Sequence, residues 1–181
     1  MNRFSKPYAD FVQRLRVPMG FLLAGLFVYL ATPTLRSVFW GLPIASFGLW
    51  LRGWAAGHLE KNERLTMTGP YAWTRNPLYL GTLILVLGMA VAAKRPLFAW
   101  ISFLAFYFVY LPAVEQEESH LRQLFPEFAA YAQRVNQFRP MFPSDDAPRK
   151  KFSWALYWRN REYKAAVAFL GMLVYLFWRA G

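Results

Sequence analysis

The chain has 181 residues, of which 56% are hydrophobic and 19% aromatic, and its 21 Lys and Arg exceed its 10 Asp and Glu by a net charge of +11. This composition is too apolar for an ordinary soluble domain, and the basic residues lie between apolar runs, which favours a membrane rather than nucleic acid as the partner. The absence of cysteine excludes disulfides and thiolate ligands, and two histidines argue against a zinc site, so no metal is expected.

Five apolar runs predict an all-α protein. They cover residues 17–31, 38–54, 78–93, 97–114 and 165–178. Each run is close to or slightly below the roughly 17–25 residues of a spanning helix, so several must use flanking aromatic residues to cross a bilayer. We therefore expect an integral membrane bundle of about five transmembrane helices. We expect a single domain over residues 1–181, with a core at about 38–140, a polar loop at 143–151 and an extra C-terminal helix at about 164–179.

The basic residues are distributed unevenly along this topology. Seventeen of the 21 Lys and Arg fall in the N-terminal tail, in the end of the second run and the segment that follows it, and in residues 115–164, which all lie on one side. The positive-inside rule then places the N-terminus and the long polar segments in the cytoplasm, for an integral protein of the bacterial inner membrane. The loops on the other side, 32–37 and 94–96, are too short to hold a site, so we expect a pocket on the cytoplasmic side.

The stretch GPYAWTRNPLYLG, residues 69–81, precedes and opens the third apolar run. Asn76 followed by Pro77 predicts a helix that starts at Pro77, because Asn is a favoured N-cap and proline at the first helical position wastes no backbone donor. Gly69 followed by Pro70 predicts a turn just upstream. Gly81, one turn inside the helix, would allow another backbone or a flat ligand to come close.

Arg75 is the unusual member of this stretch, because a cation beside a helix N-terminus opposes the helix dipole. An anion placed there would reconcile the two, since backbone N–H groups and a guanidinium can hold one carboxylate or phosphate together. The plainer alternative is a tight interhelical loop whose arginine meets lipid headgroups.

A second polar group, VEQEESHLRQLF at residues 114–125, directly follows the fourth apolar run. On a continuing helix Glu118 would share a face with Arg122, and such an exposed pair would contribute only about 0.5 kcal/mol. The alternative is an anionic pocket for a positively charged ligand. Combined with an anion site at Arg75 on the same side of the membrane, it would suit a zwitterion such as S-adenosylmethionine.

These residues resemble a known superfamily. LRGWAAGHL (51–59), RLTMTGPYAWTRNPLYLG (64–81) and EQEESHLRQLFPEFAAYAQRVNQFRP (115–140) look like the isoprenylcysteine carboxyl methyltransferase and phospholipid methyltransferase superfamily of integral membrane enzymes. The similarity covers about half of the chain, and the ordered pair of motifs is specific. It implies a helical bundle whose cytosolic half encloses S-adenosylmethionine, released as S-adenosylhomocysteine. It further implies that a lipid-like acceptor enters from the bilayer and is methylated on a carboxyl, amine or thiol group, with carboxyl methylation favoured.

The resemblance also implies site residues. The cofactor-binding residues would be Leu65, Thr68, Gly69, Pro70, Tyr71, Asn76, Pro77, Tyr79, Glu117 and Glu118, and the catalytic residues Arg75 and Glu118. Asn76 stands where eukaryotic members have histidine, Pro126 replaces a usual glycine, and Gln137 replaces a frequent basic residue. These departures bear on the acceptor more than on the cofactor.

A carboxylate acceptor needs no base, whereas an amine or thiol must lose a proton. His58 and His120 are the histidine bases that the chain offers, and Glu118 is a weaker one.

Two other functions fit parts of the sequence. One is an NADPH-dependent membrane reductase of the sterol-reductase type, which is similar to this superfamily in its C-terminal half. The other is a non-enzymatic membrane protein whose basic face binds anionic lipids, each nearby Lys or Arg contributing about 1 kcal/mol. Changing Arg75 to alanine separates them, because an enzyme would lose turnover and a lipid-binding protein would lose only a little affinity.

Overall fold

A computed structural model describes residues 4–143 and 148–181, and within these ranges the chain is helical, with no β-strand. Residue 3 of the basic N-terminal tail and residues 144–147 of the expected polar loop lie outside this description. The elements in chain order are α1 (Lys6–Leu30), α2 (Leu35–Ala56), the 3₁₀-helix η1 (Gly69–Ala72), α3 (Pro77–Ala92), α4 (Pro96–Ala105), the π-helix η2 (Phe106–Tyr110), α5 (Leu111–Leu124), α6 (Phe128–Arg134), α7 (Trp154–Arg159) and α8 (Tyr163–Ala180).

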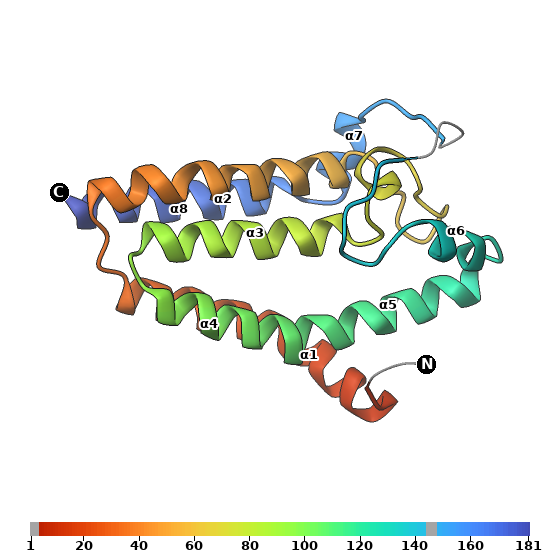
Figure 1. Cartoon of the computed structure of the whole chain (residues 1–181), viewed down its shortest axis with the longest axis horizontal. Helices are drawn as coiled ribbons and strands as arrows, with labels where there is room; N and C mark the ends of the chain where they lie inside the picture. The colour runs from red at the N-terminus through yellow and green to blue at the C-terminus, as the bar shows by residue number, and fades with distance from the viewer. Residues whose placement is uncertain (1–3, 144–147) are drawn as a thin grey trace.

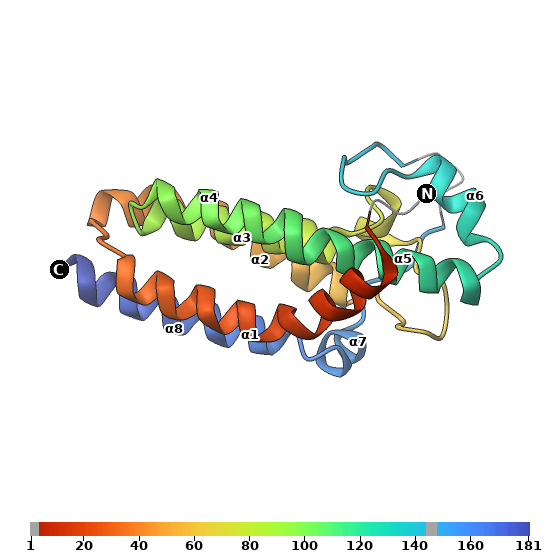
Figure 2. The ribbon, with the colours of Figure 1, turned by 90° about the horizontal axis from the view of Figure 1, so that it is seen from below.

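The five predicted apolar runs each correspond to a long helix or helical stretch, and these run side by side between two ends of the molecule (Figure 1). The start of α1, η1, α6 and α7 lie toward one end, and the C-terminus lies at the other (Figures 1 and 2). The polar segments that follow α2 and α5 therefore meet at a single end of the bundle, which we call the polar end.

Local sequence explains where the helices begin. Thr34 caps α2 and exchanges hydrogen bonds with Ser37 in a capping box. Pro77 and Pro96 open α3 and α4, so the predicted start at Pro77 is confirmed. Pro126 ends α5, because the residue before a proline avoids helical geometry and Phe125 is extended.

Glycines bring α2 and α3 into backbone contact. A Cβ atom added at Gly81 would lie 2.8 Å from the carbonyl oxygen of Gly48, and one added at Gly48 would collide with the backbone of Leu85. Gly41 and Gly88 repeat this close approach further along the same two helices. Small residues at such positions let helices pack closely where no large side chain can be accommodated. The backbone that Gly81 was expected to admit is therefore that of α2.

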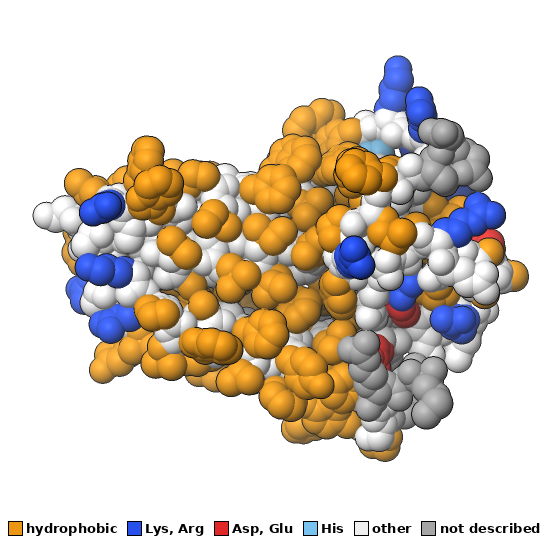
Figure 3. Space-filling view, viewed as in Figure 1, with side chains coloured by type: hydrophobic (Ala, Val, Ile, Leu, Met, Phe, Trp, Pro, Cys, Tyr) orange, Lys and Arg blue, Asp and Glu red, His pale blue; other side chains and the backbone are white. Residues whose placement is uncertain are grey.

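The outer surface of the bundle is apolar along its length. Figure 3 shows hydrophobic side chains along the middle of the bundle on the face that is viewed, with Lys and Arg gathered toward its two ends. Large side chains such as Phe21, Phe39, Trp100 and Trp178 are exposed, at 76%, 71%, 67% and 73%. In water such a surface would be a strong liability, whereas in lipid it is the expected one.

Two helical stretches of the described chain are long and apolar enough to cross a membrane, Pro96–Leu124 and Tyr163–Ala180. Val17–Leu30 and Pro77–Ala92 are apolar but shorter, with at most 17 residues each. The prediction of about five transmembrane helices is therefore supported only in part. For α3 and α1 the reason is length: the third run ends at the short turn before Pro96, and the apolar part of α1 begins only after its basic first half. α2 is long enough at 22 residues but is not among these apolar helices.

Candidate functional site

The site begins where α3 starts at the polar end. Pro77 is fully buried, and the Asn76 backbone carbonyl accepts the first helical hydrogen bond, from the Leu80 N–H at 3.0 Å. The Asn76 side chain, however, does not cap the helix. Its Nδ2 donates instead to Glu118 Oε1 at 2.7 Å. The charged Glu118 carboxylate is a strong acceptor for the Asn76 amide N–H, so Asn76 links the start of α3 to α5.

Arg75 and Glu118 form a two-point ion pair. Arg75 Nε donates to Glu118 Oε1 at 3.0 Å, and Nη2 donates to Oε2 at 2.9 Å. The Arg75 Nη1 group donates to the carbonyl oxygens of Ala132 and Val135 at 2.9 and 2.8 Å. Both charged side chains are largely buried, with 14% and 13% exposed. The anion expected beside Arg75 is thus supplied by the protein itself, from 43 residues further along the chain.

Arg75, Asn76 and Glu118 lie on the wall of a cavity of about 930 Å³ at the polar end. Eight of the eleven residues predicted for the site line it: Leu65, Tyr71, Arg75, Asn76, Pro77, Tyr79, Glu117 and Glu118. The volume is of the size of a cofactor or drug-sized ligand pocket. The two sequence segments that were expected to meet therefore share one cavity.

Thr68, Gly69 and Pro70 do not line the cavity and instead support its wall. Gly69 has a positive φ of 59°, and a Cβ atom there would lie 2.6 Å from the ring of His58. Thr68 Oγ1 lies 3.1 Å from His58 Nδ1. The turn therefore packs directly against the buried His58 ring. This close packing, together with the positive φ, requires glycine at position 69.

The two histidines have different surroundings. His58 is 3% exposed and is not part of the cavity lining, whereas His120 is exposed and lines it. Burial, together with the nearby charge of Lys150, lowers the pKa of His58 below its ordinary value. His58 therefore stays neutral at physiological pH and lies behind the site, while His120 faces the cavity.

A buried tyrosine contact connects η1 to α6. The Tyr131 hydroxyl donates to the backbone carbonyl of Tyr71 at 2.7 Å. Burial raises the pKa of both phenols, so both remain protonated and neutral. The contact fixes the turn before Arg75 against the helix that receives the Arg75 Nη1 hydrogen bonds.

A second ion pair, between Arg52 and Glu162, also lines the cavity, and the sequence did not predict it. Arg52 Nε and Nη2 donate to the two Glu162 carboxylate oxygens at 2.6 and 2.9 Å. In the sequence, the only indication of this pair is Arg52 itself, a charged residue near the end of the apolar run 38–54. Nothing in the local pattern pointed to Glu162, which is 110 residues away in sequence.

Comparison with known proteins places the chain in a family. The family model described as phospholipid methyltransferase matches residues 20–127, more than half of the chain. The cobalt-zinc-cadmium resistance protein CzcN of Cupriavidus metallidurans is 32% identical over 137 residues, which cover 74% of this chain and 61% of that protein. The nickel-cobalt-cadmium resistance protein NccN of Alcaligenes xylosoxydans xylosoxydans is 33% identical over 138 residues, or 74% and 62% of the two chains.

The chain thus spans about three fifths of the length of these relatives. No solved structure matches it. Among the described residues there is no group of three or more His, Cys, Asp and Glu that could hold a metal ion. The family match and the two long apolar helices together indicate association with a membrane. The chain belongs to the phospholipid methyltransferase family.

Proposed function

We propose that the chain is an integral membrane methyltransferase that transfers the methyl group of S-adenosylmethionine to a lipid-like acceptor in the cavity at the polar end. The observation that carries this proposal is the position of the two sequence motifs. They belong to a chain of the phospholipid methyltransferase family, they are joined by the Arg75–Glu118 ion pair, and they line one cavity of about 930 Å³.

The chemistry of the lining suits a zwitterionic cofactor. Glu117 and Glu118 place carboxylates beside the start of α3 for the ammonium and sulfonium charges, and Tyr79 offers an aromatic ring. Leu65 and Pro77 add apolar surface against which the adenine base of the cofactor could pack. Thr68, Gly69 and Pro70, which were expected to bind the cofactor, would act indirectly by holding the turn and His58 behind the wall.

Arg75 is a positioning residue in this proposal. Four of its five N–H groups are directed at Glu118 and at the carbonyl oxygens of Ala132 and Val135. Arg75 therefore orients Glu118, and the direct contact with the bound molecule falls to Glu118. Methyl transfer from a sulfonium needs alignment rather than a metal or a covalent intermediate, and good alignment can contribute about 7–11 kcal/mol.

The acceptor enters the same cavity from the membrane. Val17 of α1 and Tyr110 of η2 line the cavity on the side of the apolar helices. An amine or thiol acceptor would require a base, and His120 is the histidine that the cavity offers. A carboxyl acceptor would require none.

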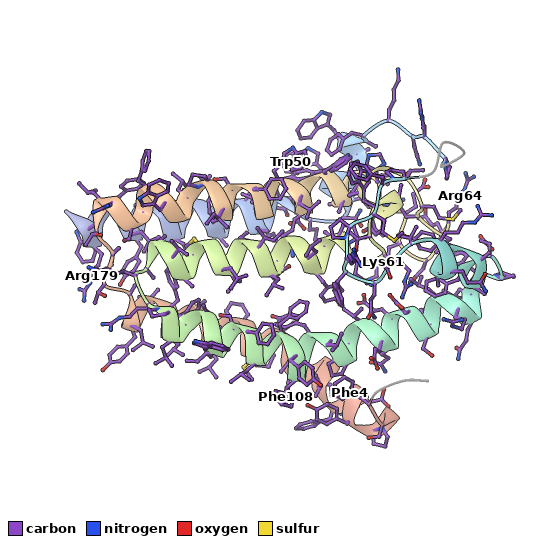
Figure 4. All side chains as sticks on the ribbon, viewed as in Figure 1. Phe4, Trp50, Lys61, Arg64, Phe108 and Arg179 are labelled. Carbon is purple, nitrogen blue, oxygen red and sulfur yellow. The ribbon has the colours of Figure 1, made fainter. Side chains whose placement is uncertain are left out.

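For the membrane topology we propose five crossings, by α1, α2, α3, the α4–α5 stretch and α8. Arg179 lies at the end opposite Lys61 and Arg64 (Figure 4). The excess of basic residues at the polar end then places the cavity and the N-terminus in the cytoplasm.

The test is calorimetric titration of the detergent-solubilised protein with S-adenosylhomocysteine, followed by transfer of labelled methyl from S-adenosylmethionine into a membrane lipid extract. We expect saturable binding and a labelled lipid. Release of the label as methanol by base would identify an ester. Absence of binding at millimolar ligand by a folded protein would refute the proposal.

A further inference from the structure

The cavity has a second buried ion pair, of which one partner lies beyond the family match. Glu162 directly precedes α8, beyond the matched residues 20–127, whereas Arg52 lies in α2. The Glu162 side chain is 8% exposed and that of Arg52 is 23% exposed. Both line the cavity. The C-terminal part of the chain, which had no assigned role, therefore contributes a carboxylate to the site.

The donors of Arg52 are almost fully used inside the protein. Its Nε and Nη2 hold the two oxygens of Glu162, and its Nη1 donates to the Thr82 hydroxyl and to the Leu78 carbonyl oxygen, the latter at 3.4 Å. Thr82 in turn donates to the Leu78 carbonyl at 2.8 Å. Arg52 thus ties Glu162 to the first turns of α3.

Within the described part of the chain, the acceptors of Glu162 are not fully used. Each carboxylate oxygen accepts one hydrogen bond from Arg52, and a carboxylate offers about four acceptor positions. Because the side chain is buried on the cavity wall, bulk water cannot satisfy the remaining positions freely. A molecule in the cavity that carries N–H or O–H donors can do so.

Stability alone is a poor explanation for this pair. Taking two charges out of water costs about as much as their attraction returns, and apolar replacements of buried pairs are often neutral or stabilising. The pair between Arg159 and Glu63 offers a contrast, because it joins the same C-terminal region to the loop after α2 with both side chains about half exposed, at 48% and 59%.

We propose that Glu162 binds the molecule held in the cavity by accepting hydrogen bonds from its ammonium or hydroxyl groups, and that Arg52 is the residue that positions the Glu162 carboxylate. The identity of that molecule rests on the proposed function. Both the cofactor and an amine-bearing lipid headgroup carry such donors, so the chemistry is shared and the experiment separates the two sources.

The principal variant is Glu162→Gln, which keeps the side-chain shape and one acceptor oxygen but removes the charge. The matched control is Glu63→Gln, in the exposed pair outside the cavity lining. In one arm S-adenosylhomocysteine binding is measured by calorimetry. In the other, binding of phosphatidylethanolamine, which has N–H donors, is compared with that of phosphatidylcholine, which has none, by native mass spectrometry.

We expect Glu162→Gln to weaken one of these interactions about tenfold or more, as for the loss of a hydrogen bond to a charged group, and Glu63→Gln to change neither. Weaker S-adenosylhomocysteine binding would assign Glu162 to the cofactor. Loss of the preference for phosphatidylethanolamine would assign it to the acceptor headgroup. A Glu162→Gln protein with both interactions unchanged would overturn the proposal.

A double variant covers the case in which Glu162→Gln does not fold. Arg52→Met with Glu162→Met replaces the pair by apolar side chains of similar size and should keep the fold. If this variant bound both molecules as the wild type does, the proposal would be overturned. Failure of the wild type to bind S-adenosylhomocysteine would instead count against the proposed function, and the phosphatidylethanolamine arm would still decide the role of Glu162.

Discussion

Replacing Arg75 by alanine removes four hydrogen bonds at once. Two of them hold Glu118, at 3.0 and 2.9 Å, and two hold the carbonyl oxygens of Ala132 and Val135, at 2.9 and 2.8 Å. The Glu118 side chain is only 13% exposed in the wild type, and among the described residues Asn76, at 2.7 Å, would be its remaining hydrogen-bond partner. The variant therefore leaves a buried charge without a counterion.

Removing one partner of a buried ion pair costs about 3–5 kcal/mol, and the Asn76 contact favours the lower part of this range. For a chain of this length about 1 kcal/mol corresponds to roughly 2–4 °C, so the unfolding midpoint should fall by roughly 6–20 °C. The exposed Glu63–Arg159 pair is the matched control, since such pairs contribute about 0–1 kcal/mol.

The assay is thermal unfolding in detergent, followed by the fluorescence of the eight tryptophans. Arg75→Ala should unfold well below the wild type, and Arg159→Ala should remain close to it. The double variant Arg75→Met with Glu118→Met should recover most of the lost stability, because it buries no unpaired charge, yet it should not turn over substrate. Equal midpoints for Arg75→Ala and Arg159→Ala would refute the reasoning.

Three further predictions follow from the packing around the site. Gly48→Ala should lower the free energy of unfolding by about 1–3 kcal/mol relative to Gly171→Ala, because its Cβ meets the backbone of α3 whereas that at Gly171 meets nothing within 4 Å; equal effects in thermal unfolding would contradict this. Tyr131→Phe should cost about 0.5–1.5 kcal/mol by the same assay, since it removes the hydrogen bond to Tyr71, and an unchanged midpoint would count against that bond. The lowered pKa of His58 means that the unfolded chain binds its proton more readily, so stability should be complete above the ordinary value of 6.5 and decrease as the pH falls below it; unfolding midpoints from pH 8 to 5 should slope less in His58→Gln, and identical slopes would argue against this role.

Much of the architecture could be predicted from the sequence because it is local. The apolar runs gave the long helices, and the Asn76–Pro77 pair gave the start of α3. Hydrophobic length and proline geometry act over a few residues, so they can be recognised without knowing the fold. The order of the two polar motifs also identified the family, which the comparison confirmed.

Which groups meet was decided by the tertiary structure. Glu118 on a helix was expected to face Arg122 or a ligand, but it pairs with Arg75 across 43 residues, and Asn76 turns to it instead of capping α3. Glu162 reaches Arg52 across 110 residues. Local sequence determines which positions are helical and where charges stand along the chain, whereas the partner of a buried charge depends on how distant helices pack, because a carboxylate taken out of water must find its counterion in three dimensions.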